Sequence, residues 1–170
     1  IVGQAFWAVD FPIMGRYTPE EIRRKPYLRG RDLVEALEAC EKFKDMTVSV
    51  FNFVEGTRFR KDKHARQKSP FRHLLRPKAG GVALMMGAMG DRIHDILNVT
   101  IVYPRGVRNF WDYLCGKVEE IRVHVERLTV TPDLVGDYTS NSAYRSHIQD
   151  WLNDLWKRKD LLIDEMLLWQ

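Results

Sequence analysis

Apolar residues recur along the chain in two different periods, which predict both helices and strands. Between Arg31 and Lys44 they fall three and four positions apart, the spacing of one buried helix face. A shorter helix is predicted to start at Thr18, because proline and two glutamates follow this threonine in the order of an N-cap and first turn. From Ser140 onward the pattern is again helical, with a break expected at Lys159–Asp160.

Three segments have the features of β-strands. Thr47–Phe53 is rich in β-branched and aromatic residues and predicts a buried strand. Ile96–Tyr103 predicts a second strand, which Pro104 would end. In 121–126, aliphatic residues alternate with polar ones, which indicates a half-exposed strand whose polar side, with His124, faces solvent.

Two more helices are predicted between these strands. Ala79–Met89 contains small and apolar residues, and its glycines favour close packing rather than a phosphate loop. Asn109 is expected to cap a short helix of mainly aromatic residues over 110–114. The order of helices and strands predicts an α/β fold, a sheet flanked by helices. Residues 1–135 would form this domain, and 136–170 a helical C-terminal arm.

The composition agrees with a folded chain that does not cross a membrane. Of 170 residues, 45% are hydrophobic and 29% are charged, which excludes a disordered or collagen-like chain. No apolar run reaches the length of a spanning helix. Cys40 and Cys115 are too few for a disulfide framework, so both are expected to be reduced thiols in packed helices.

Positive charge is concentrated between Arg58 and Lys78. This basic loop holds nine Lys and Arg against one acidic residue, a net charge of +8, whereas the whole chain carries +4. Such a field attracts a phosphorylated cofactor, an anionic membrane or a nucleic acid, although a merely solvated loop has the same composition. Nucleic acid is not predicted as a partner, because only Phe59 and Phe71 interleave the charges.

The segment Glu55-Gly56-Thr57-Arg58 lies where the first predicted strand ends and the basic loop begins. Ligands of α/β sheets bind at such strand ends. Glycine permits a sharp turn, threonine offers a hydroxyl, and arginine offers a fork suited to phosphate. Glu55 could orient that fork or bind a hydroxyl and is expected to stay ionised. The alternative is a tight turn with an ion pair.

The five histidines lack metal-ligand spacing, so no metal site is predicted.

These residues carry a family resemblance. Phe53-x-Glu55-Gly56-Thr57-Arg58 resembles the third conserved block of the glycerolipid acyltransferases, the PlsC-like 1-acyl-glycerol-3-phosphate acyltransferase family. Asn98–Pro104 is similar to the fourth block, a strand ending in proline. Pro77–Gly81 is similar to the segment between those blocks in the lysocardiolipin acyltransferase branch. Gly3–Arg16 resembles the second block, so the likeness covers about residues 1–105.

The resemblance implies an acyltransferase-type sheet and a set of substrate-binding residues. Glu55, Gly56, Thr57 and Arg58 would form the acceptor site, and Arg16 would help to hold the phosphate. Tyr103 and Pro104 would shape the substrate pocket. From charge alone, four further residues are hypothesised to meet the phosphates of coenzyme A or of anionic lipid. They are Lys61, Lys63, Arg66 and Arg72.

The implied reaction is transfer of a fatty acyl group from a coenzyme A or acyl-carrier-protein thioester to a lysophospholipid or glycerol phosphate, without a cofactor. In the family the general base is the histidine of an H-x-x-x-x-D block, which is absent from this sequence. Because the sequence begins with Ile1, we expect a fragment that is inactive alone and whose parent protein is the enzyme. The alternative is a non-catalytic module that binds an anionic surface, phospholipid or nucleic acid, through the basic loop 58–78.

Further expectations concern partners and location. The resemblance implies phospholipid partners and residence at the cytoplasmic face of a membrane, such as the bacterial inner membrane. The Trp-rich tail, with Trp151, Trp156 and Trp169, could touch that membrane, although aromatic residues at helical spacing more often pack in a core. A sheet that lacks its first strands would expose an edge, so self-association through that edge is predicted.

Overall fold

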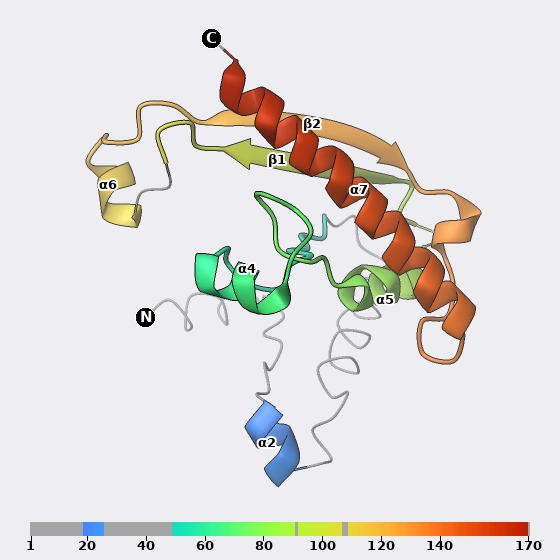
Figure 1. Cartoon of the computed structure of the whole chain (residues 1–170). Coiled ribbons are helices and arrows are strands. Elements are labelled where there is room, and N and C mark those ends of the chain that lie inside the picture. The colour runs from blue at the N-terminus through green and yellow to red at the C-terminus, as the bar shows by residue number, and fades with distance from the viewer. Residues whose placement is uncertain (1–18, 26–48, 91, 107–108, 170) are drawn as a thin grey trace, which may run out of the picture.

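The computed structural model describes residues 19–25, 49–90, 92–106 and 109–169 (Figure 1). The predictions for Arg16, Cys40 and the helix over 31–44 lie outside the described residues. The described elements are α2 (Pro19–Arg24), α4 (Lys61–Gln67), α5 (Ala79–Met89), β1 (Asp95–Val102), α6 (Phe110–Leu114), β2 (Arg122–Thr129), the 3-10 helix η2 (Pro132–Leu134) and α7 (Ser142–Leu168). The mixed helix-and-strand class is therefore confirmed.

The sheet consists of β1 and β2, which pair in antiparallel fashion. Val99 lies opposite Val125, and Ile101 lies opposite Val123. The long helix α7 crosses one face of this pair, and α5 lies near the N-terminal half of α7 (Figure 1). Within the described ranges no third strand joins the sheet.

The sequence predicts that the polar face of the sheet is exposed and the aliphatic face buried. The structure shows the reverse. Alternation in 121–126 is confirmed, but the polar side faces α7: the Arg122 guanidinium donates to the carbonyl oxygen of Met166, and His124 is half-buried. The aliphatic side chains on the other face, such as Val123 and Val125, are each 53% exposed. Periodicity identifies a strand but not which side a distant helix will cover.

The core forms between α7 and α5. Buried side chains of both helices meet Phe71 from the loop before α5 and Leu134 from η2. The members on α7 recur three and four residues apart, as an amphipathic stripe requires. They include Tyr144, Ile148, Leu152, Leu155 and Trp156. Core packing of the Trp-rich tail is thus confirmed for Trp156, and residues on both sides of position 135 share one core.

The break predicted at Lys159–Asp160 is wrong, because α7 is continuous from Ser142 to Leu168. Both residues are compatible with a helix, and each has a partner outside it. The Lys159 ammonium donates to the carbonyl oxygen of Val99 at 2.8 Å, and the Asp160 carboxylate accepts the backbone N–H of Arg72 at 2.7 Å.

Two further predictions fail in the described residues. Ser49–Phe53 is not a strand, and its aromatic side chains are exposed, Phe51 by 87% and Phe53 by 84%. A strand needs a hydrogen-bonded neighbour, and β1 pairs only with β2 among the described elements. Cys115 is exposed rather than packed in a helix, because it follows α6 in a turn.

Close packing at the glycines of α5 is confirmed at Gly87. A Cβ atom at this position would lie 2.7 Å from the carbonyl oxygen of Gly136, a backbone atom that cannot rotate away. At Gly80 the nearest atom would be the Tyr138 hydroxyl oxygen at 3.7 Å, an ordinary contact.

We therefore predict that Gly87→Ala lowers the free energy of unfolding by about 1–3 kcal/mol, although alanine favours helices. The matched control, Gly80→Ala, should leave it unchanged or raise it by up to about 1 kcal/mol. Urea unfolding followed by circular dichroism measures both. Equal effects of the two substitutions would contradict the close approach at Gly87.

Candidate functional site

The turn that the sequence singled out, Glu55–Arg58, is fixed by backbone hydrogen bonds. The amide of Gly56 donates to the carbonyl oxygen of Phe53 at 2.7 Å, and the amide of Lys78 donates to that of Val54 at 2.9 Å. Gly56 has φ +67°, a conformation that side chains other than glycine rarely adopt. The turn therefore lies directly against the segment that leads into α5.

The half-buried side chain of Glu55 points toward α7 and the loop before α5. Its Oε1 accepts the backbone N–H of Leu75 at 3.1 Å and the indole N–H of Trp156 at 3.4 Å. Burial raises the pKa of the Glu55 carboxyl above its ordinary value, and these two donors and the Lys159 charge oppose the rise. Glu55 thus ties the turn to α7, and it makes no ion pair with Arg58 within the described part of the chain.

A second polar contact beside Glu55 links α7 to the sheet. The Lys159 ammonium donates to the side-chain oxygen of Asn98 at 2.6 Å and lies 5.3 Å from the ring centroid of Trp156. The amide of Asn98 in turn donates to the carboxylate of Glu126 at 3.0 Å. Burial lowers the pKa of Lys159 to about 8, although Glu55 and Glu126 favour its charged form.

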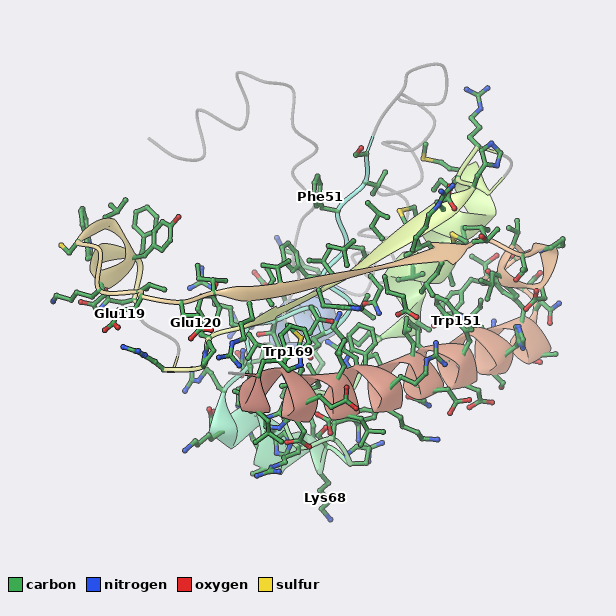
Figure 2. All side chains as sticks on the ribbon, turned by 90° about the horizontal axis from the view of Figure 1, so that it is seen from above. Phe51, Lys68, Glu119, Glu120, Trp151 and Trp169 are labelled. Carbon is green, nitrogen blue, oxygen red and sulfur yellow. The ribbon has the colours of Figure 1, made fainter. Side chains whose placement is uncertain are left out.

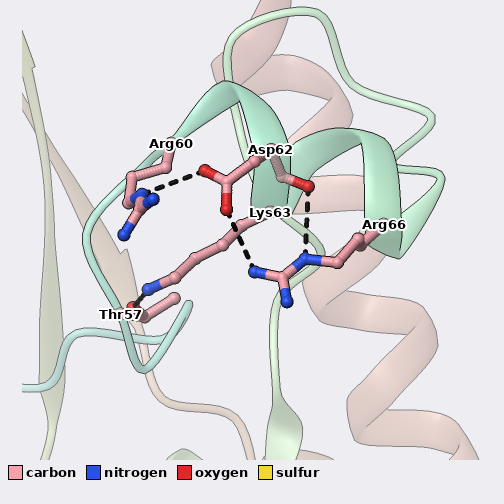
Figure 3. Close-up of polar contacts among 5 residues, drawn as sticks. All are labelled: Thr57, Arg60, Asp62, Lys63 and Arg66. Atoms are coloured by element: carbon pink, nitrogen blue, oxygen red, sulfur yellow. Dashed lines mark hydrogen bonds and ion pairs between the residues drawn. The ribbon is translucent and has the colours of Figure 1, made fainter.

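Two lysine side chains lie against the turn, and Arg58 follows it in the sequence. The ammonium of Lys63, on α4, donates to the hydroxyl of Thr57 (Figure 3). The ammonium of Lys78 lies 3.6 Å from the point that a Cβ atom of Gly56 would occupy. Arg58 is exposed, and its guanidinium has no hydrogen-bond or ion-pair partner among the described residues. We call Gly56, Thr57, Arg58, Lys63 and Lys78 the cationic turn.

Two other arginines, the N-cap Arg60 and Arg66 on α4, are engaged with one carboxylate. Asp62 accepts from the Nε of Arg60 at 2.9 Å and from the Nη2 of Arg66 at 3.1 Å (Figure 3). Desolvation alone would raise the pKa of Asp62, but the two guanidinium groups together lower it. Lys61 is exposed at the first position of the helix. Of the four predicted phosphate contacts, only Lys63 directly contacts the turn.

Arg72 belongs to a different cluster, which fastens the loop before α5 to α7. The Asp160 carboxylate accepts the backbone N–H groups of Arg72 and His73 at 2.7 and 2.8 Å. One oxygen of Asp164 accepts from the Arg72 guanidinium at 3.0 Å and contacts the His73 ring at 2.8 Å. The hydrogen bond with His73 lowers the pKa of Asp164. This cluster stabilises the loop that presents Leu75 to Glu55.

The remaining predicted residues are not joined to the turn. Tyr103 and Pro104 are half-buried just beyond β1, where the carbonyl oxygen of Tyr103 accepts the amide of Gly106 at 2.9 Å. No hydrogen bond of the described residues connects them to the cationic turn. Nor do the described histidines, cysteines and acidic residues form a group that could hold a metal ion.

Sequence reasoning assigned no individual site role to three residues that lie beside the turn or contact Glu55 and its neighbours. Lys78 was predicted only as part of the basic loop, Trp156 as part of a tail that packs in the core or touches a membrane, and Lys159 as part of a helix break. Trp156 lies 101 positions from Glu55. Their pairing follows from where α7 packs, so no spacing within the sequence indicates it.

No family model, curated protein or solved structure matches the chain. Among the described helices, none combines the length and the apolar character needed to cross a bilayer.

The half-buried Lys159 predicts a pH dependence of stability. The folded side chain releases its proton near pH 8, whereas the unfolded one keeps it to about 10.5. Because the unfolded state binds more protons between these values, the free energy of unfolding should rise with pH there. The slope is at most about 1.4 kcal/mol per pH unit and smaller for a partly exposed group.

Urea unfolding at several pH values across this window tests the prediction, with Lys159→Met as the comparison. The variant should lack the rise that the wild type shows. Parallel slopes for the two proteins would mean that Lys159 keeps an ordinary pKa in the fold.

Proposed function

We propose that this chain supplies the acceptor-binding part of a glycerolipid acyltransferase, with the cationic turn holding the phosphate of a glycerol phosphate or lysophospholipid. The observation that carries the proposal is that the ammonium groups of Lys63 and Lys78 lie against the Gly56–Thr57 turn, which the exposed Arg58 follows directly in the sequence. A phosphate oxygen accepts charge-assisted hydrogen bonds from ammonium and guanidinium groups, which are stronger than those between neutral groups. The family resemblance of this segment supports the same assignment.

Each residue of the cationic turn has a role that its geometry supports. The Lys63 ammonium has three N–H groups, and one of them donates to Thr57, which leaves two for a ligand. Arg58 offers a planar fork to two phosphate oxygens. Glycine at position 56 leaves the backbone open to close approach, and the Lys78 side chain borders that opening.

The general base of the proposed reaction would come from outside this sequence. The reaction needs a base to take the proton of the acceptor hydroxyl as the oxygen attacks the thioester carbon and the thiolate leaves. Three of the five described histidines are engaged in other contacts: His64 with the carbonyl oxygen of Phe71, His73 with Asp164, and His147 with Asp133. We therefore propose that this chain alone binds the acceptor without transferring an acyl group, and that the enzyme acts at the cytoplasmic face of a membrane.

A second candidate is a non-catalytic module that binds anionic surfaces through 58–78. The observation that favours it is the exposure of Arg60, Lys61 and Arg66 on α4 beside the turn. The two functions differ in their ligand. An acceptor site binds a single glycerol phosphate molecule, whereas a surface module requires many phosphates held together and loses affinity steeply with salt.

Substitutions at the turn test the acceptor site. Lys63→Met and Arg58→Gln should each weaken the binding of glycerol phosphate about tenfold, because each removes a charge-assisted hydrogen bond. Isothermal titration calorimetry with glycerol phosphate measures this, with plain glycerol as the ligand control.

The matched control is Arg66→Gln, which removes the same charge from α4, where Arg66 is held by Asp62. It should change the affinity less than about twofold. Equal losses in all three variants would favour the surface module. No binding by the wild-type protein would refute the acceptor site.

Self-association is also proposed, since the aliphatic face of the sheet is open. Leu97, Val99, Ile101, Val123 and Val125 are each between 44% and 63% exposed, and neither edge of the sheet is paired within the described ranges. Such surfaces favour association. Sedimentation velocity should show species larger than the 20.0 kDa chain. Val123→Lys should shift the protein toward monomer, and a monomeric wild type would contradict the proposal.

A further inference from the structure

Helix α6 and its flanking turns project from the end of the sheet where β1 ends and β2 begins (Figures 1 and 2). Its apolar side chains are open to solvent: Phe110 is 69% exposed, Trp111 72%, Tyr113 53% and Leu114 57%. Phe110 and Trp111 touch edge to face, with ring centroids 6.1 Å apart. Such a concentration of exposed aromatic residues is unusual unless they have a partner.

The short helix is nevertheless well formed and two-sided. Its N-cap, Asn109, accepts the backbone N–H of Asp112 at 2.8 Å. At about 100° per residue, the four apolar side chains share one side of the helix, and Asp112 lies on the other. Asp112 is only 21% exposed and accepts from the Lys117 ammonium at 3.0 Å. The ion pair between Asp112 and Lys117 therefore fixes the polar side of α6, so that the aromatic side faces solvent.

The described charged residues around α6 form ion pairs. Lys117 pairs with Asp112, Arg105 with Glu119, and Arg122 with Glu120. This pairing lowers the cost of moving these described charged groups out of water. The unpaired positive charge lies instead on and around α4, which lies toward the same end of the molecule in both views (Figures 1 and 2).

The C-terminal end of α7 lies at this same end of the sheet. Val102 at the end of β1 packs with Ile163 and Met166 of α7. Beyond them, Leu168 is 80% exposed and Trp169 is 46% exposed. Aromatic and aliphatic side chains from two elements thus face solvent at the end of the molecule that α6 occupies.

We propose that α6, with the C-terminal end of α7, inserts into the interfacial layer of an anionic lipid bilayer. Tryptophan and tyrosine carry an apolar ring and one polar group, a combination that suits the boundary between headgroups and hydrocarbon. The basic residues near α4 match the negative charge of such a surface. This inference rests on the proposed function in one respect only, namely that the partner is a lipid.

A bilayer fits this surface better than a second copy of the chain. A protein interface needs a broad complementary area, whereas α6 is a single projecting turn with four apolar side chains. The flat aliphatic face of the sheet, which suits packing on protein, lies on β1 and β2 and contains no aromatic residue among its exposed members. Insertion of a small projecting element into lipid requires no complementary surface.

Vesicle sedimentation of the full chain tests the proposal, with vesicles of phosphatidylcholine and phosphatidylglycerol compared with phosphatidylcholine alone. The wild type should bind the anionic vesicles more tightly. The double variant Phe110→Ser, Trp111→Ser should bind them at least about tenfold less well. The matched control, Phe51→Ser with Leu161→Ser, removes similarly exposed apolar side chains elsewhere and should change binding less than about twofold.

Failure of wild-type binding to both vesicles, or equal losses in the two double variants, would overturn the proposal. Failure of bilayer binding can be distinguished from failure of the acceptor site. The Phe110 and Trp111 variant should bind soluble glycerol phosphate as the wild type does. A loss of both activities in this variant, with intact circular dichroism, would mean that α6 acts on the turn rather than on lipid.

Discussion

The described structure depends on the burial of one side of α7. The stripe from Tyr144 to Met166 covers α5 at one end and the sheet at the other, and burying such side chains contributes about 1.5–3 kcal/mol each. The same helix carries the polar groups that hold the rest. Trp156 and Lys159 contact Glu55 and β1, and Asp160 and Asp164 hold the loop before α5. Displacing α7 would release the sheet and the turn together.

The sequence predicted those helices and strands well whose formation depends on capping residues and on the local pattern of apolar residues. The capped helix after Asn109, the small-residue helix α5 and the strands β1 and β2 were all expected close to their observed bounds. What the sequence could not reveal is which surfaces meet. The polar side of β2 is covered because α7, which begins at Ser142, brings hydrogen-bonding partners to it. Ser49–Phe53 has strand-forming residues, but no neighbouring strand among the described elements pairs with it.

In the candidate site, too, the local turn was predicted from the sequence, whereas the contacts between distant segments were not. The motif located the turn, and the need for glycine at position 56 follows from its φ of +67°. The observed contacts of Glu55 could not be predicted from the sequence, because its partners Leu75 and Trp156 lie 20 and 101 residues away. Burial then outweighs the nearby positive charges and raises its pKa. The exposure of the α6 aromatic residues was equally hidden, since a pattern of apolar residues does not reveal that nothing will cover them.

The central claim is that the cationic turn, fixed from behind by α7, binds the phosphate of a glycerolipid acceptor. The most direct measurement is a titration of ¹⁵N-labelled protein with glycerol phosphate, followed by backbone amide chemical shifts. The account predicts saturable shifts concentrated at Gly56, Thr57 and Arg58 and at the neighbouring Lys63 and Lys78. Shifts spread evenly over the basic residues of α4, or confined to segments far from the turn, would contradict it.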